Sequence, residues 1–247
     1  MNPFEAFRSY SGTARPELPL DRILARRDAV LHRLMQSYQA LIEEESKQVV
    51  WLVEQGALSR AYTTAVDALH GVEFSLEDLE DVCLELDSNE GVTTPMGAPS
   101  GIFIAALCNQ VPAQDIVLNL RLFRHRWPFM GYKLPQGRRL HLEGDAGDYV
   151  GALLEGGDIV VTGNAGNYTG VGMKTGTVHI GYSTGKHTGE GMRGGLLRVG
   201  GRIAALGRVQ QGEVYEGTQQ VFPALIPDPA PSLVPAPKKK SRTSTVR

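Results

Sequence analysis

The fold is decided by residues 140–201, which read LHLEGDAGDYVGALLEGGDIVVTGNAGNYTGVGMKTGTVHIGYSTGKHTGEGMRGGLLRVGG. Laid over itself with a shift of nineteen residues, this stretch repeats almost position for position, which is typical of a solenoid. One apolar column holds Leu140, Ile159, Val178 and Leu197, and a second, two residues further on, holds Leu142, Val161, Ile180 and Val199. Because alternate side chains of a strand point to opposite faces, each repeat is predicted to begin with a short strand whose apolar columns face inward.

Glycines recur at three further positions of the repeat and predict its corners. They are Gly147, Gly166 and Gly185, then Gly151, Gly170 and Gly189, then Gly157, Gly176 and Gly195. At such corners the backbone takes positive φ or passes close to another coil, and a Cβ penalises both. Stacked coils lie about 4.8 Å apart, so each strand finds partners in the neighbouring coils. The repeat therefore predicts a parallel β-helix. We expect it to be right-handed because parallel crossovers are generally right-handed.

The N-terminal half carries helical rather than solenoid signals. Apolar residues at three-and-four spacing between Ile23 and Ile42 predict an amphipathic helix. The apolar set 49–53 is predicted to end its helix at Gly56, and residues 57–70 are predicted to form the next helix. Ser75 and Asp78 resemble a capping box. The apolar run 102–107 predicts a short buried helix.

These patterns divide the chain into four parts and give an α+β fold. We expect a loose N-terminal arm over 1–19, a helical region over 20–112 and a glycine-rich β-helix over 113–222. Alternating residues over 116–123 predict a strand that forms the first, irregular rung of the β-helix. The Pro-rich, basic stretch 223–247 is predicted to be a disordered tail.

Composition restricts the class of protein. With 247 residues, 42% of them apolar, the chain can bury an ordinary core. The net charge is −2, but the last ten residues carry five basic side chains and no acid, so the body is more acidic and nucleic acid is not an expected partner. The sequence predicts neither a signal peptide nor a membrane span. Cys83 and Cys108 lack metal-ligand spacing, and the cytoplasm is the expected location.

The repeats resemble a known family. The segment LEGDAGDYVGALLEGG from Leu142 resembles the glycine-rich (GXGXG) C-terminal β-helix domain of the glutamate synthase large subunit. The segments GNAGNYTGVGMKTG from Gly163 and GKHTGEGMRGG from Gly185 are equally similar to the C subunit of formylmethanofuran dehydrogenase and of the related formyltransferase/hydrolase complex. The likeness covers residues 137–215. It implies a β-helix that holds other domains or subunits in place and carries no catalytic residue of its own.

One motif points instead to catalysis. Gly181–Gly185 reads GYSTG and satisfies the G-x-S-x-G pattern of a hydrolase, with Ser183 as nucleophile and His187 or His179 as base. Such a nucleophile lies on a strained turn between a strand and a helix. Residues 186–191 have no helical period, and Ser183 shares a repeat column with Asp145 and Asn164. The repeat explains the motif better than catalysis does.

Other chemical motifs also fall on repeat columns. His141 and His179 share an outward column but lie two coils apart with Val160 between them, so they are not expected to bind one metal. Glycine patterns near Gly170 and Gly185 approximate nucleotide loops, but they recur one coil later or lack the required spacing. We expect no metal and no cofactor.

Two kinds of side-chain ladder are predicted at the corners. Asp145 with Asn164, and Asp148 with Asn167, are expected to bond turn backbone. Tyr149, Tyr168 and His187 form a further column, which is either a stacked ladder or a partner-facing patch.

The sequence thus predicts a non-catalytic scaffold or adaptor subunit of a multi-subunit metabolic enzyme complex. Its expected partners are other protein subunits, with self-association through the open β-helix ends as a further possibility. A glutamate synthase-related subunit, a hydrolase that uses Ser183 and a free-standing oligomeric binding protein are the alternatives.

Overall fold

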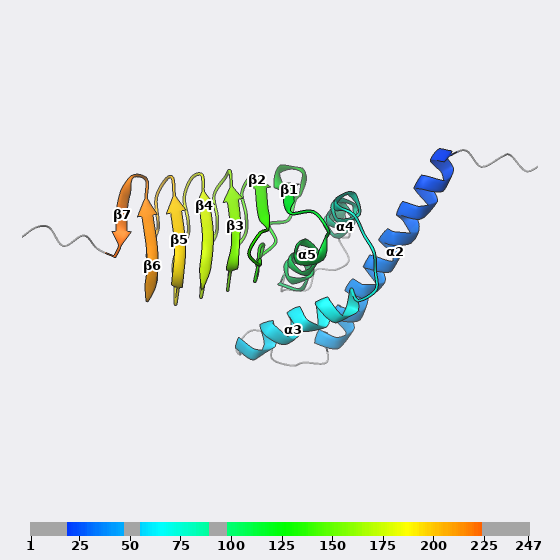
Figure 1. Cartoon of the computed structure of the whole chain (residues 1–247), viewed down its shortest axis with the longest axis horizontal. Coiled ribbons are helices and arrows are strands. Elements are labelled where there is room, and N and C mark those ends of the chain that lie inside the picture. The colour runs from blue at the N-terminus through cyan, green and yellow to red at the C-terminus, as the bar shows by residue number, and fades with distance from the viewer. Residues whose placement is uncertain (1–18, 47–54, 89–97, 224–247) are drawn as a thin grey trace, which may run out of the picture.

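The computed structural model describes residues 19–46, 55–88 and 98–223 and consists of a helical unit followed by a parallel β-solenoid of about four turns (Figure 1). The helices are α2 (Pro19–Ser46), α3 (Gln55–Ala68), α4 (Leu76–Ser88) and α5 (Ala98–Gln110). The strands are β1 (Asp115–Asn119), β2 (Arg139–Glu143), β3 (Glu155–Val161), β4 (Thr175–Ile180), β5 (Arg193–Val199), β6 (Gln211–Glu216) and β7 (Gln219–Phe222), with a 3₁₀ turn η2 (Leu120–Leu122) after β1. The α+β fold predicted from the repeat is confirmed. The predicted arm before residue 19, the apolar set 49–53 and the predicted tail beyond residue 223 lie outside the described residues.

Helix α5 is the centre of the helical unit. Every residue from Gly101 to Cys108 is buried, which explains why this stretch is apolar on all sides rather than along one stripe. The predicted buried helix over 102–107 is therefore confirmed. Helices α2, α3 and α4 each pack against α5. Within the described ranges, no helix has a length and hydropathy that suit a membrane crossing.

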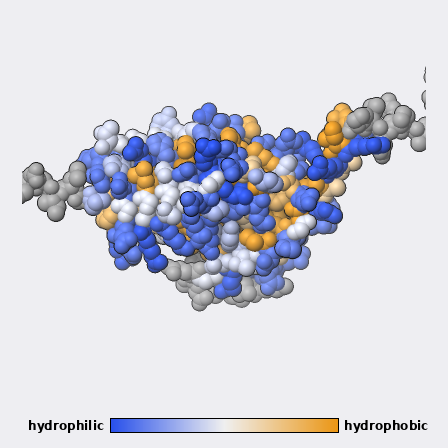
Figure 2. Space-filling model, in the orientation of Figure 1, coloured by the Kyte–Doolittle hydropathy of each residue, from blue (hydrophilic) through white to orange (hydrophobic). Residues whose placement is uncertain are grey.

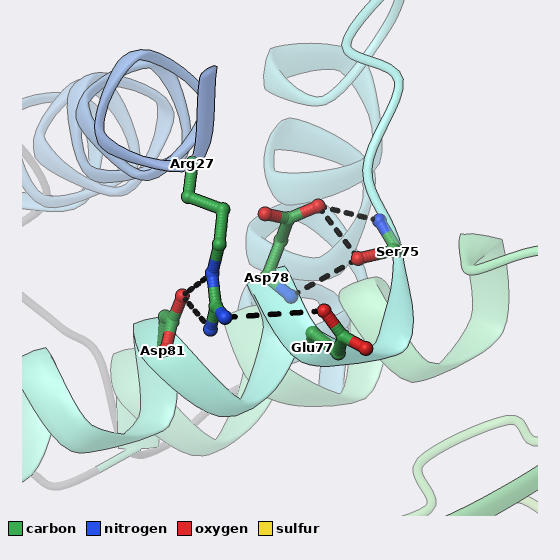
Figure 3. Close-up of polar contacts among 5 residues, drawn as sticks. All are labelled: Arg27, Ser75, Glu77, Asp78 and Asp81. Carbon is green, nitrogen blue, oxygen red and sulfur yellow. Dashed lines mark hydrogen bonds and ion pairs between the residues drawn. The ribbon is translucent and has the colours of Figure 1, made fainter. Parts of the chain in front are cut away.

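The helix boundaries follow local chemistry, with one correction. The predicted capping box is present at the start of α4: the Ser75 N–H donates to Asp78 Oδ2 at 2.8 Å, and the Asp78 N–H donates to Ser75 Oγ at 3.3 Å (Figure 3). The prediction that Gly56 ends a helix is wrong, because Gly56 lies in the first turn of α3. A glycine after an apolar run is compatible with both positions, and the sequence pattern did not distinguish them.

The solenoid strands pair in parallel and in the predicted register. Leu140 lies beside Ile159, Ile159 beside Val178, and Val178 beside Leu197. The four side chains of this column are at most 1% exposed. The inward columns therefore form one continuous core through the stacked coils.

The first and last coils depart from the nineteen-residue period. Ile116 pairs with Leu140, so the first coil is longer, and the strand predicted over 116–123 already ends at Asn119. It ends there because Asn119 Oδ1 accepts the Arg121 N–H at 3.1 Å and turns the chain into η2. At the other end β7 runs antiparallel to β6. This short edge strand, followed at once by Pro223, ends the parallel pairing.

The helical unit is attached to the first coil through the C-terminus of α5. Arg138 Nη1 donates to the carbonyl oxygens of Cys108, Val111 and Ala113 at 3.0, 2.7 and 3.0 Å. Cys108 lies in the last turn of α5, and Val111 and Ala113 follow it, so Arg138 lies at the C-terminal end of the helix, where a cation is favourable. Asn109 Nδ2 donates to the Tyr132 carbonyl at 2.9 Å. The N-terminal end of the solenoid core is thereby covered by helix.

Candidate functional site

The most regular chemical feature of the solenoid is a column of stacked rings at one corner. Phe129, Tyr149, Tyr168 and His187 follow one another with ring centroids 4.6, 5.0 and 4.6 Å apart and interplanar angles of 13, 4 and 8°. All four residues have positive φ, between 57 and 64°. The column predicted from Tyr149, Tyr168 and His187 is thus a stacked ladder. The spacing lies within the range of favourable aromatic pairs.

Backbone hydrogen bonds between coils create this stack. The N–H of Phe129 donates to the Asp148 carbonyl, that of Tyr149 to the Asn167 carbonyl and that of Tyr168 to the Lys186 carbonyl, all at 2.8–2.9 Å. Each bond fixes one corner above the next, so the side chains project in the same direction one coil apart. Each inner ring is then covered on both faces by its neighbours, whereas the His187 side chain at the end of the stack is 50% exposed.

Phe129 is the rung that sequence reasoning missed. It precedes Tyr149 by twenty residues, one more than the period, so it fell outside the aligned columns. A signal was present: an aromatic ring followed two residues later by glycine occurs in Phe129–Gly131, Tyr149–Gly151 and Tyr168–Gly170, and His187–Gly189 repeats it with an imidazole. Three of these four glycines belong to the predicted corners.

The strain in the ladder gives a test in which two substitutions are compared. Tyr168→Ala removes both stacked contacts and is expected to reduce the free energy of unfolding by about 2 kcal/mol. Tyr168→Gly removes the same contacts but relieves the positive φ of 57°, so it should be more stable than the alanine variant by about 1 kcal/mol. Urea unfolding followed by far-UV circular dichroism compares the two. An alanine variant equal to or more stable than the glycine variant would contradict strain at this corner.

Polar ladders run beside the aromatic one. Asp145 Oδ1 accepts the Asn164 N–H at 2.8 Å, and Asn164 Oδ1 accepts the Ser183 N–H at 3.1 Å. Asp148 and Asn167 form the second ladder: Asp148 Oδ1 accepts the Asn167 N–H at 2.7 Å. Hydrogen bonds from the Asn164 N–H and side chain hold the pKa of Asp145 below its ordinary value. In both ladders a side-chain oxygen bonds the backbone N–H of the next coil.

Ser183 belongs to the first of these ladders. Its Oγ accepts the N–H of Arg202, one coil further on, at 3.1 Å. The His187 ring instead lies against Tyr168, with Nδ1 3.9 Å from a Glu190 carboxylate oxygen. In the described part of the chain no hydrogen bond joins Ser183 to His187, and residues 181–192 form no helix. Strand β4 ends at Ile180, directly before the motif, but the helix that must follow the turn of a nucleophile elbow is not formed.

The remaining candidates are placed as follows. His141 and His179 both lie beside Val160 in the outward column, one on each side of it, and are half-buried. Among residues 19–46, 55–88 and 98–223, no cluster of three His, Cys, Asp or Glu side chains could hold a metal ion.

The corner glycines fall into two classes. Gly151, Gly170, Gly176, Gly189 and Gly195 have positive φ, whereas Gly147, Gly157, Gly166 and Gly185 lie against the backbone of the preceding coil.

A partly buried polar cluster between the helices and the first coil was not found from the sequence. Asn109 Nδ2 donates to Tyr62 Oη at 2.8 Å, and Lys133 Nζ lies 5.4 and 5.5 Å from the ring centroids of Tyr62 and Tyr132. Burial raises the pKa of Tyr132 to about 12, so its phenol stays neutral and cannot serve as a base at neutral pH. Residues 62, 109 and 132 are far apart in sequence, and nothing in their local patterns pairs them.

The two cysteines are equally unsuited to catalysis. Cys83 and Cys108 are free and fully buried in the helical unit. Burial raises the pKa of Cys108 to about 12 and that of Cys83 well above its ordinary value. The reactive thiolate is therefore not formed at neutral pH.

Helices α2 and α4 expose several large apolar side chains. Leu20, Ile23 and Leu24 of α2 and Leu84 of α4 are between 49 and 60% exposed. Figure 2 shows an apolar surface at the projecting end of α2. Large contiguous apolar patches are typical of surfaces that contact another molecule.

Comparisons with family models, with curated proteins and with solved structures found no match to the chain.

Proposed function

We propose that the chain is a non-catalytic scaffold or adaptor subunit of a multi-subunit metabolic enzyme complex in the cytoplasm. One observation carries the proposal: the solenoid side chains that resemble catalytic groups bond or stack on adjacent coils. Ser183 Oγ accepts the Arg202 N–H, and the His187 ring stacks on Tyr168. The Ser183 hydroxyl and the His187 ring thus connect neighbouring coils, as expected of side chains in a rigid spacer.

The division of the chain into two units supports the same function. The solenoid supplies a stiff body, because each coil is bonded to the next through strands and ladders. The helical unit is fixed to its first coil through Arg138 and exposes the apolar side chains of α2 and α4. A stiff body with an apolar contact face at one end suits a subunit that positions other subunits.

The client complex is proposed from the resemblance of residues 137–215. A formyl-transfer complex of the formylmethanofuran dehydrogenase or formyltransferase/hydrolase type is the first proposal, and a glutamate synthase-related complex is the second. The resemblance favours neither, since both contain a similar glycine-rich β-helix.

Purification of the tagged full-length chain under native conditions, followed by mass spectrometry, tests this function. Stoichiometric recovery of subunits of one enzyme complex is expected, and their identity assigns the client. Recovery of the chain without any enzyme subunit would contradict the scaffold function.

Substitution of Ser183 separates the scaffold from the hydrolase alternative. Ser183→Ala leaves the Arg202 N–H without its partner and is expected to cost about 1 kcal/mol of stability, because the site is partly exposed. Any turnover of p-nitrophenyl esters by the purified chain should be equal in the wild type and the variant. Abolished turnover in a folded variant would establish Ser183 as a nucleophile and refute the scaffold assignment.

A further inference from the structure

We draw no further inference here: the strongest candidate, the exposed apolar stripe that Leu20, Ile23 and Leu24 form on the projecting end of α2 (Figure 2), carries none because nothing in the structure shows what covers it.

Discussion

Replacing Gly101 with alanine is expected to lower the free energy of unfolding by about 3 kcal/mol, at the upper end of the usual cost of overpacking. The direction is opposite to intrinsic helix propensity, by which alanine is better than glycine by about 1 kcal/mol in a helix. We expect the packing cost to exceed this gain, so that alanine destabilises the protein. A Cβ at Gly101 would overlap the carbonyl oxygen of Pro128 and lie 2.9 Å from its carbonyl carbon. Because the obstacle is backbone, α5 or the first coil must move as a whole.

The matched control is Gly56→Ala, which makes the same substitution in the first turn of α3. A Cβ there would meet only the Arg60 side chain at 3.5 Å, an ordinary contact, and Gly56 is exposed. This variant should be as stable as the wild type or slightly more stable. Urea unfolding is followed by circular dichroism for both units and by tryptophan fluorescence, to which Trp127 beside Pro128 contributes. Equal stability of the Gly101 and Gly56 variants would show that α5 is not held against the first coil.

The solenoid could be predicted because its residues repeat with a fixed period. A fixed shift of nineteen residues aligns the inward columns, and parallel stacking then follows from the need of each strand for partners in the next coil. The same logic identified the ring column and the Asp145 ladder as features of corners. Alignment by the nineteen-residue shift missed features where the period changes. Phe129 is displaced by one residue, and β7 reverses direction, so neither has an aligned counterpart.

The helical unit was predictable only element by element. Three-and-four spacing and the Ser75 capping box predict helices, but a spacing pattern does not say which residue of another element a side chain will meet. The hydrogen bonds from Arg138 to three carbonyls at and just after the end of α5 join positions 25 to 30 residues apart. Helix boundaries are harder to predict, as Gly56 shows, because glycine is found near both ends of helices. The exposed stripe of α2 could be predicted as apolar, but its exposure depends on where α3, α4 and α5 end.

Asp87 of α4 makes a long-range contact that holds the helical unit against the first coil of the solenoid. The residue is 8% exposed at the C-terminal end of α4, where the helix dipole disfavours a carboxylate. Its Oδ1 accepts the N–H of Arg124 and of His125, both at 2.9 Å, and lies 3.0 Å from His125 Nδ1. Two backbone N–H groups of the loop before the first solenoid corner are thus paired with one buried charge. The loop is held against α4 through this carboxylate.

Asp87→Asn is therefore expected to reduce the free energy of unfolding by about 2 kcal/mol near neutral pH, since it replaces charge-assisted hydrogen bonds with neutral ones. Burial by itself raises the pKa of Asp87, but the N–H groups of Arg124 and His125 and the His125 ring outweigh it and hold the pKa below its ordinary value. A lowered pKa means that the charged carboxylate stabilises the fold above the unfolded-state pKa of about 3.9, and that this contribution is lost as the pH falls through the lower, folded-state value. The stability difference between wild type and variant should accordingly be present above about pH 5 and shrink below about pH 4. Urea unfolding at a series of pH values measures it, with Asp67→Asn, an exposed position on α3, as the control that should show almost no difference at any pH. A difference that persists undiminished in acid would mean that Asp87 acts through its shape and not through its charge.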